Sequence, residues 1–432
     1  MQLLDQIFGL KDENTTVSVE LRAGLVTFLT LSYILFVNPQ ILAEAGMPRQ
    51  DVVVATALAS AAATLLMGLW ANLPFALAPG MGLNVYFTFG VVGALGVSWQ
   101  VALAAVFVEG LLFLALALTG IRGALLRAIP APIKIATMSG IGLFLAMIGL
   151  QNAGVVRDDP RNLVGLGNLA DRSTMLALAG LMLMAALMSR RVKGAILLGI
   201  LSVSLAAWGS GIAPAPASIF TIPSLPKETF LALDFSGLLT GELLVVVLAF
   251  LFVDFFDTAG TLIGVGRLAG FVDERGDLPR ADRAFSADAV GTTVGALLGT
   301  STVTSYVESA TGVEEGGRTG LTAVTVAVLF VVSLFLTPLF VAVPTIATAP
   351  ALIVVGALMM RGAKELDWLR IDEAIPAFLT LAAMPLTFSI ANGITLGIVS
   401  FVVIKVLSGR FREVHPLMYF LAALLVLFHS LR

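Results

Sequence analysis

Apolar runs of about 20 residues follow one another along nearly the whole of this 432-residue chain. A helix rises by about 1.5 Å per residue, so each run is long enough to cross the ~30 Å hydrocarbon core of a bilayer. The sequence therefore predicts an all-α polytopic membrane protein, which passes many times through a cell membrane and has the lipid bilayer as its surroundings.

Composition narrows the class further. Hydrophobic residues make up 58% of the chain and charged residues 12%, and the mean hydropathy is +0.99, whereas soluble domains carry about 25% charged residues. The polar residues 1–20 are unlike a cleavable signal. The chain has no cysteine, and its two histidines, His415 and His429, lie near the end. Disulfides and histidine-based metal or proton-relay sites in the body of the chain are therefore excluded, and we expect neither a metal nor a cofactor.

The apolar segments predict fourteen spans in two sets of seven, with a polar break between the sets. The first set lies near residues 22–41, 51–70, 81–92, 99–119, 131–151, 173–189 and 192–211. The second set lies near residues 243–266, 284–298, 304–313, 319–340, 346–361, 373–389 and 391–408. Because seven is odd, the halves 1–211 and 238–408 are expected to be inverted repeats. A short hydrophobic segment at 415–430 is expected to lie at the membrane interface or to be a tilted short helix.

Two of these segments are too short to cross a bilayer as helices. Residues 81–92 and 304–313 belong to stretches rich in glycine and small polar residues, LAPGMGLNVYFTFG at 77–90 and GTSTVTSYVESATG at 299–312, which are separated by 222 positions. We expect two half-helices entered by short extended strands, since such backbone is tolerated only inside protein or against a cavity. Broken segments at matching places in two halves indicate a transporter binding site near the bilayer midplane.

Charge placement gives the orientation. With fourteen crossings and the N-terminus inside, 19 lysines and arginines fall on the cytoplasmic side and 5 outside. This excess agrees with the positive-inside rule, and it predicts a cytoplasmic N-terminus.

Acidic residues inside the apolar segments are the candidate functional groups. Asp254 lies 12 residues after Glu242 and 13 before Arg267, so it is expected near mid-membrane, where an ionisable residue is a functional hypothesis by default. Asp257 follows on nearly the same helix face. The glycine run Gly260, Gly264 and Gly266 is expected to let another backbone approach closely. The alternative role for Asp254 is a structural pair with a base or hydroxyl on a neighbouring helix.

Glu308 is the corresponding acid on the second broken segment. Its alternative roles are helix capping, which favours shorter side chains, or hydrogen bonds to the surrounding serines and threonines. Asp288 is either a local structural carboxylate or part of a proton path. Glu109, in the span 99–119, fits a buried hydrogen-bonded acid better than a ligand contact.

Two acids without a nearby base favour a ligand that presents N–H donors, or a cation. A carboxylate accepts two hydrogen bonds side by side, which suits the edge of a flat heterocycle. Tyr306, Tyr86 and Phe87 are candidates for a stacking face. The chain has no phosphate-binding G-x-x-x-x-G-K-[ST] loop, so transport is expected to use an ion gradient.

Four motifs resemble those of the AzgA-like purine permeases, a branch of the nucleobase–ascorbate (nucleobase:cation symporter) family. They are FLTLSYILFVNP at 28–39, APGMGLN at 78–84, FVDFFDTAGT at 252–261 and TSTVTSYVESATGV at 300–313. The resemblance covers essentially the whole chain. It implies a 7+7 inverted repeat with a core domain, from spans within 22–119 and 238–340, and a gate domain, from spans within 131–211 and 346–408. It also implies a homodimer that moves purine bases together with protons.

The resemblance also implies roles for single residues. Carried over by motif, Asp254 and Glu308 would hold the base, and Asn84 and Gly82 would line the site with Tyr306. Asp257 and Asp288 would be supporting polar residues, and Glu308 is the first candidate for coupling protonation to binding. The uracil and xanthine branches typically have Glu where Asp254 stands, and the shorter acid would leave room for a purine.

The sequence thus predicts a proton-coupled importer of adenine, guanine or hypoxanthine that works by elevator-like alternating access. One alternative is a uracil or xanthine permease of the same family. Another is an anion exchanger of the same fold, although two site acids oppose an anion. An enzyme is not expected, because a nucleophile–base pair or metal ligand set is missing, and no nucleic-acid partner is expected.

Overall fold

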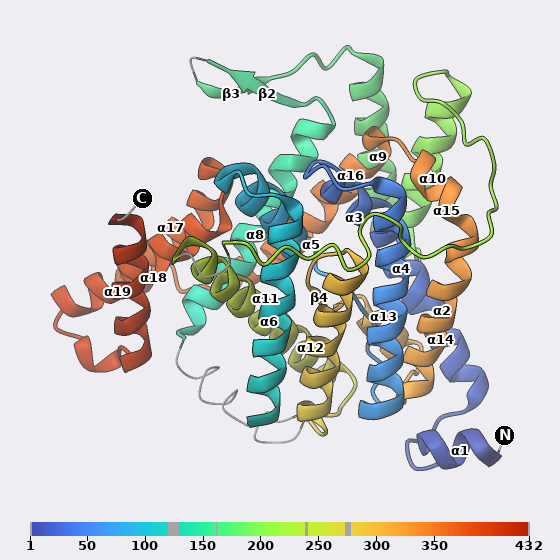
Figure 1. The fold of residues 1–432 in the computed structure, drawn as a ribbon, viewed down its shortest axis with the longest axis horizontal. Helices are drawn as coiled ribbons and strands as arrows, with labels where there is room; N and C mark the ends of the chain where they lie inside the picture. Colours follow the sequence, from blue (N-terminus) through green and yellow to red (C-terminus); the bar gives the residue numbers. More distant parts are fainter. Residues whose placement is uncertain (1, 120–128, 161, 238–240, 273–277, 431–432) are drawn as a thin grey trace.

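A computed structural model describes residues 2–119, 129–160, 162–237, 241–272 and 278–430 (Figure 1). Four residues of the charge count lie outside these ranges, namely Arg122, Arg127, Arg161 and Arg275. The expected start of the second half, at 238–240, also lies outside the described residues.

The described chain is mostly helical, as predicted. In the first half the elements are α1 (Gln2–Phe8), α2 (Val17–Leu31), α3 (Ile34–Ala43), α4 (Arg49–Leu66), η1 (Met67–Ala71), β1 (Leu77–Pro79), α5 (Met81–Val85), η2 (Tyr86–Gly93), α6 (Trp99–Thr119), α8 (Ala131–Asn152), β2 (Val156–Asp159), β3 (Leu163–Leu166), α9 (Arg172–Ser189) and α10 (Ala195–Gly209). In the second half they are α11 (Gly241–Leu268), α12 (Ala281–Leu298), β4 (Val303–Ser305), α13 (Ser309–Glu314), α14 (Gly320–Ser333), η3 (Leu334–Leu336), α15 (Thr337–Ala342), α16 (Thr345–Met359), η4 (Met360–Glu365), α17 (Ile371–Thr387), α18 (Ile390–Leu407), η5 (Phe411–Glu413) and α19 (Pro416–Ser430).

Nine helical stretches within the described residues are long and apolar enough to cross a membrane, so the protein is a polytopic membrane protein. The other five expected spans fall below that length or hydropathy. The helices at Met81–Gly93 and Ala195–Gly209 are short, α13 has 6 residues, and α17 has 17 residues with two internal prolines. Helix α12 carries Asp282 in its first turn and Asp288 in its interior.

Helix starts follow local sequence signals. Thr16, Asp171, Thr319 and Ser389 each accept a hydrogen bond from a backbone N–H of the helix that they precede, which satisfies one of the donors left free at a helix N-terminus. The expected span 22–41 contains a break, since α2 ends at Leu31 and α3 begins at Ile34.

Short antiparallel strands join the two broken segments, as the sequence predicted. Leu77 of β1 faces Ser305 of β4, and Pro79 faces Val303. With a constant offset of 222 positions between the two halves, Gly299 would be the residue equivalent to Leu77, the first residue of β1. Strand β4, however, begins only at Val303. The two halves therefore differ in the length of the loop that leads into the strand.

A threonine on the preceding helix holds each strand in the same way. Thr64 Oγ1 of α4 accepts from the N–H of Leu77 at 2.9 Å and donates to its carbonyl at 3.0 Å. Thr292 Oγ1 of α12 accepts from the N–H of Val303 at 3.1 Å and donates to its carbonyl at 2.8 Å. Because lipid cannot satisfy backbone polar groups, these paired contacts allow short extended backbone inside the membrane.

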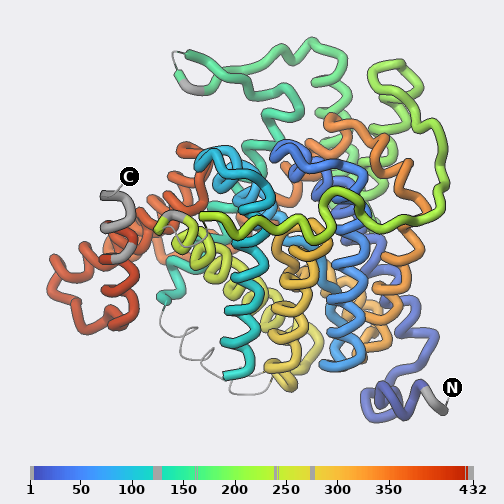
Figure 2. Tube along the Cα trace, in the orientation of Figure 1, coloured from blue at the N-terminus to red at the C-terminus, as the bar shows by residue number. Residues whose placement is uncertain are grey.

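The helices pack in two groups. Helix α12 packs against α4 and α6, and α14 packs against α2 and α4. Helix α8 packs against α16 and α17, α9 packs against α10 and α16, and α17 packs against α18. Helices α17, α18 and α19 lie at one side of the molecule, with the N-terminal helix α1 at the opposite end (Figures 1 and 2).

An irregular segment between α10 and α11 crosses the surface of the first group (Figure 1). The N–H groups of Lys227, Glu228 and Thr229 all donate to Asp51 Oδ2 of α4. The N–H of Leu231 donates to the carbonyl of Leu297 at the end of α12. The segment therefore connects the start of α4 with the end of α12.

Helix α19 covers the hydrophobic segment expected at 415–430, and it packs against α18. Ahead of it, Glu413 of η5 contacts Lys405 of α18 at 2.6 Å. The Lys405 ammonium lowers the pKa of Glu413. The ion pair fixes the turn from which α19 starts.

The threonine contacts can be tested by thermal unfolding in detergent. Thr64→Val and Thr292→Val leave one buried N–H and one buried carbonyl without a partner, which costs about 1–3 kcal/mol per group, so each variant should unfold at a lower temperature. Thr325→Val is the matched control, because Thr325 Oγ1 donates only to the carbonyl of Leu321 in its own helix. An unfolding temperature for Thr64→Val and Thr292→Val equal to that of Thr325→Val would show that the strands do not depend on them.

Candidate functional site

Glu308 lies in the short turn between β4 and α13, next to the paired strands. It occupies the N-terminal position of α13 but makes no side-chain cap, so the capping alternative is wrong. Its Oε1 accepts a hydrogen bond of 2.7 Å from the hydroxyl of Tyr33, in the break between α2 and α3. The side chain is half-buried, and the next residue back, Val307, is 61% exposed. Glu308 is therefore only partly enclosed by the described residues.

Close packing holds α13 against α2, and this positions Glu308 near Tyr33. Thr311 Oγ1 and Thr30 Oγ1 lie 2.9 Å apart. A side chain at Gly312 would collide with Thr27 Oγ1 and would lie 2.8 Å from the carbonyl of Ala23. Sequence reasoning missed Tyr33, although it lies inside the motif at 28–39 and is one of only four tyrosines in the chain.

Asp257 of α11, not Asp254, is the acid that faces Glu308. The charges of Asp257 and Glu308 act on one another, and Asp257 is half-buried. No described residue covers the same side of α11, since none lies within 4 Å of a side chain built at Gly260 or Gly264. The expectation that these glycines admit a neighbouring backbone is therefore wrong, and they border open space beside Asp257.

Asp254 lies on the sealed side of the same helix. It is 0% exposed, and its Oδ2 accepts a long hydrogen bond of 3.4 Å from Thr292 Oγ1. Its side chain lies within hydrogen-bonding reach of Glu109 on α6. The structure thus brings Asp254 together with Glu109 and does not bring it to Glu308.

Asp288 of α12 links α11 to β4. Its Oδ1 accepts from Thr258 Oγ1 at 2.8 Å and from Ser305 Oγ at 3.2 Å. These contacts match the structural alternative that the sequence left open, while its Oδ2 has no hydrogen-bond partner.

Asn84 and Gly82 lie on the first half-helix. Asn84 is buried, its Oδ1 accepts from Ser301 Oγ, and its Nδ2 has no partner. Gly82 lies against α8, where a side chain would collide with Ile141 Cγ2, so this glycine lets the half-helix approach α8.

The aromatic residues near the site are fixed in the core. Tyr306 is 5% exposed, and its hydroxyl donates to the carbonyl of Pro79 at 2.6 Å, which ties the two half-helices together. Tyr86 packs edge-on against Phe250 with ring centroids 4.9 Å apart, and Phe87 is 0% exposed. Tyr86 and Phe87 therefore offer no open stacking face in this conformation.

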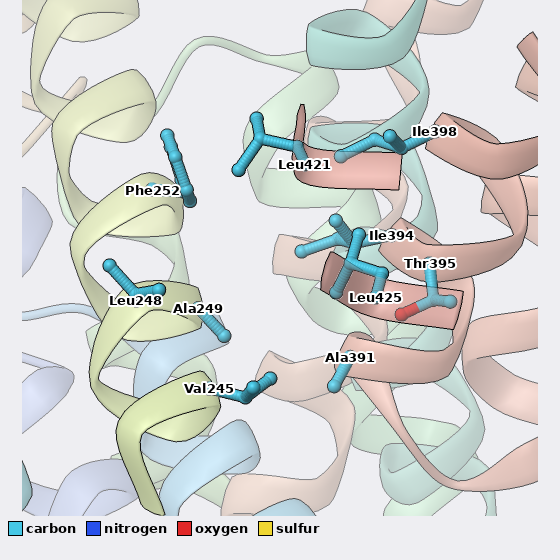
Figure 3. Close-up of a pocket in the computed structure, with 10 residues that line it drawn as sticks. All are labelled: Val245, Leu248, Ala249, Phe252, Ala391, Ile394, Thr395, Ile398, Leu421 and Leu425. Atoms are coloured by element: carbon cyan, nitrogen blue, oxygen red, sulfur yellow. The ribbon is translucent and has the colours of Figure 1, made fainter. Parts of the chain in front are cut away.

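An apolar crevice lies between α11 and the pair α18 and α19 (Figure 3). Ten residues line it: Val245, Leu248, Ala249, Phe252, Ala391, Ile394, Thr395, Ile398, Leu421 and Leu425. Thr395 is the one polar side chain among them, so the crevice lacks the acceptors that a polar heterocycle requires.

These features define a class of protein: a polytopic membrane transporter in which two half-helices meet through paired strands, with acidic groups at the junction. The sequence profile of the Permease family (Xan_ur_permease) matches residues 19–396. The chain therefore belongs to this permease family, as the four motifs predicted, and it is a transporter and not an enzyme.

Several relatives match almost the whole chain. A putative permease of Methanocaldococcus jannaschii is 53% identical over 99% of this chain and 98% of its own length. The guanine/hypoxanthine permease PbuO of Bacillus subtilis is 46% identical over 97% of this chain and 98% of its own length. The adenine permease AdeP of Escherichia coli is 42% identical over 98% of this chain and 95% of its own length.

Solved structures share the fold at low identity. The transmembrane domain of the cyanobacterial bicarbonate transporter BicA superposes with a TM-score of 0.68 at 15% identity, over 88% of this chain and 97% of that domain. The murine anion transporter Slc26a9 gives a TM-score of 0.64 at 10% identity, over 91% of this chain and 68% of its own.

The role of Gly82 can be tested by a double-mutant cycle. Gly82→Ala should lower the unfolding temperature in detergent, because the new methyl group collides with Ile141. Adding Ile141→Ala should recover part of the loss, with a coupling of about 0.5–3 kcal/mol. Strictly additive effects would place the two residues out of contact.

Proposed function

We propose that this protein is a secondary active transporter that imports purine nucleobases, namely adenine, guanine or hypoxanthine, by proton symport. The observation that carries the proposal is the half-buried Glu308 at the strand junction, whose carboxylate Tyr33 orients and on which no described lysine or arginine acts. Such a group recognises N–H donors on the edge of a heterocycle. Relatives named as adenine and guanine/hypoxanthine permeases, matched over nearly the whole chain, support the choice of purines.

The proposed purine-binding residues are Glu308, Asp254, Asn84, Gly82 and Tyr306. Glu308 accepts from the N–H edge, and the free Nδ2 of Asn84 donates to a ring nitrogen or carbonyl. Tyr306 and Gly82 shape the junction. Asp254 is sealed behind the site, so its proposed part in purine binding is indirect and involves no contact with the base.

Glu308 is our first candidate for coupling protonation to purine binding, with Asp257 and Asp288 in support. The charge of Asp257 acts on Asp288 as well as on its half-buried neighbour Glu308. A proton taken up at one acid therefore changes the electrostatic environment of the others.

We further propose fourteen spans arranged as a 7+7 inverted repeat with a core and a gate domain, and transport by elevator-like alternating access. The antiparallel β1–β4 pair and the matching contacts of Thr64 and Thr292 support the inverted repeat. The two helix groups support the division into two bodies, and the apolar crevice between α11 and α18 offers a surface without hydrogen bonds along which they can slide.

The proposed orientation places the N-terminus in the cytoplasm. Arg22 and Lys193 both form ion pairs with Glu315, and Arg280 pairs with Glu13. These contacts gather loops from several parts of the chain at the N-terminal end, where the positive-inside rule expects them. The homodimer that the family resemblance implies is part of the same proposal.

Anion exchange is disfavoured although the fold is shared with a bicarbonate transporter. Glu308 and Asp257 are both half-buried and act on one another electrostatically, and two carboxylates repel an anion.

Purine uptake into proteoliposomes tests the proposal. A panel of radiolabelled adenine, guanine, hypoxanthine, xanthine and uracil should show proton-gradient-driven uptake of one or more of the first three. Glu308→Ala should lower that uptake by at least about tenfold, since charged hydrogen bonds contribute about 1.5–3 kcal/mol, while the variant stays folded in the membrane. Glu44→Ala, at an exposed position at the end of α3, is the control. Wild-type uptake by Glu308→Ala would refute the assignment.

Tyr33→Phe removes one hydroxyl and keeps the ring. Without this donor Glu308 is less well oriented, so we expect the KM for purine to rise by roughly tenfold with unchanged expression. Tyr419→Phe is the matched control, because the Tyr419 hydroxyl donates to the carbonyl of Phe411 on the surface. An unchanged KM in Tyr33→Phe would mean that the contact with Glu308 is not used in binding.

A further inference from the structure

Glu109 is a buried acid to which no described residue offers a hydrogen-bond donor when the group is ionised. It lies mid-way along α6, is 0% exposed, and neither of its carboxyl oxygens has a partner when the group is taken as ionised. Glu20 is equally buried, yet it accepts from the N–H groups of Arg318 and Thr319 and from Thr322 Oγ1. The chain can therefore satisfy a buried carboxylate with donors, and at Glu109 it does not.

The polar group within reach of Glu109 is the carboxyl of Asp254. Asp254 Oδ1 also lacks a donor. The hydroxyl of Thr292 has a single hydrogen, and its 2.8 Å contact with the carbonyl of Val303 is much shorter than its 3.4 Å contact with Asp254 Oδ2. Two ionised carboxylates cannot hydrogen-bond to each other, whereas one proton between them allows an O–H of one to donate to an oxygen of the other.

Among the described residues, none brings a compensating positive charge to the pair. The charged groups of the described residues that act on it are acidic: Asp288 of α12 acts on both, and Asp257 of α11 acts on Asp254. At the same level α6 and α12 are in close contact, since a side chain at Gly110 would lie 2.6 Å from Thr293 Oγ1 and 2.9 Å from the Thr293 nitrogen. Leaving both acids ionised there would bury two unpaired like charges, which is strongly unfavourable.

We propose that Glu109 and Asp254 share one proton and form a proton-binding site separate from the purine contact at Glu308. Asp257 and Asp288 connect the two sites electrostatically. The charges of both act on Asp254, the charge of Asp257 also acts on Asp288, and the charge of Glu308 acts on Asp257. In this arrangement Glu109 is a positioning residue, because it acts on the purine site only through the proton that it holds with Asp254. That this proton moves with the substrate rests on the proposed proton symport. That the two acids share a proton does not depend on the proposed function.

Infrared spectroscopy tests the shared proton without any transport assay. Purified full-length protein at neutral pH should show the C=O stretch of a protonated carboxyl group, shifted by exchange into heavy water. The double variant Glu109→Gln/Asp254→Asn should lose that intensity, and Glu20→Gln should keep it. Intensity in the double variant equal to that of the wild type would overturn the proposal. If the double variant does not fold, the single variant Glu109→Gln replaces it. The new amide donates to Asp254 and lets Asp254 ionise, so the intensity of the protonated-carboxyl band should fall. An unchanged band in this variant would overturn the proposal.

Transport by Glu109→Gln tests the coupling. Purine exchange between equal internal and external pools should stay within about twofold of wild type, while proton-driven accumulation should fall by about tenfold or more and lose its pH dependence. Glu109→Asp retains an acid and should keep a pH-dependent uptake with a changed midpoint. A pH profile of Glu109→Gln that matches wild type would overturn the coupling. Failure of the wild type to accumulate any purine would instead refute the proposed function and leave the infrared result standing.

Discussion

The pairing of β1 with β4 is the contact on which the site depends. Extended backbone inside a membrane protein survives only if its N–H and carbonyl groups find partners within the protein. Here each three-residue strand pairs with the other, and a threonine from the preceding helix holds each one, Thr64 at Leu77 and Thr292 at Val303. This arrangement lets two half-helices begin in the interior, and it delivers Asn84 and Glu308 to one place.

The acids on and around α11 fall into two sets with different access. Glu308 and Asp257 are half-buried and border the open side of α11, whereas Glu109, Asp254 and Asp288 are sealed. Thr292 links the strand contacts to the sealed acids, because its hydroxyl donates to the carbonyl of Val303 and also lies near Asp254. A movement of the strand junction when ligand binds would therefore change the environment of the sealed acids, which gives a physical route for coupling between them.

Much of this organisation could be predicted from the sequence. Run lengths and hydropathy placed the helices to within a few residues, and the Gly- and Pro-rich interruptions predicted both half-helices and their strands. Which acid of α11 faces Glu308 could not be predicted. Asp254 and Asp257 lie about 60° apart around a helix of 3.6 residues per turn, so the choice depends on how α11 is rotated against its neighbours. Tyr33 could not be singled out from the sequence, because the break between α2 and α3 consists of Ser32 and Tyr33 and contains neither glycine nor proline.

The most direct test of the account is the affinity of the purified protein for a purine and for its N-methylated derivatives. If the carboxylate of Glu308 reads an N–H edge of the base, methylation of the nitrogen that donates to it should weaken binding by about 1.5–3 kcal/mol, or roughly 10- to 150-fold. Methylation at a position away from that edge should have a much smaller effect. Equal affinity for the parent base and for every mono-methylated derivative would contradict a carboxylate-based purine site.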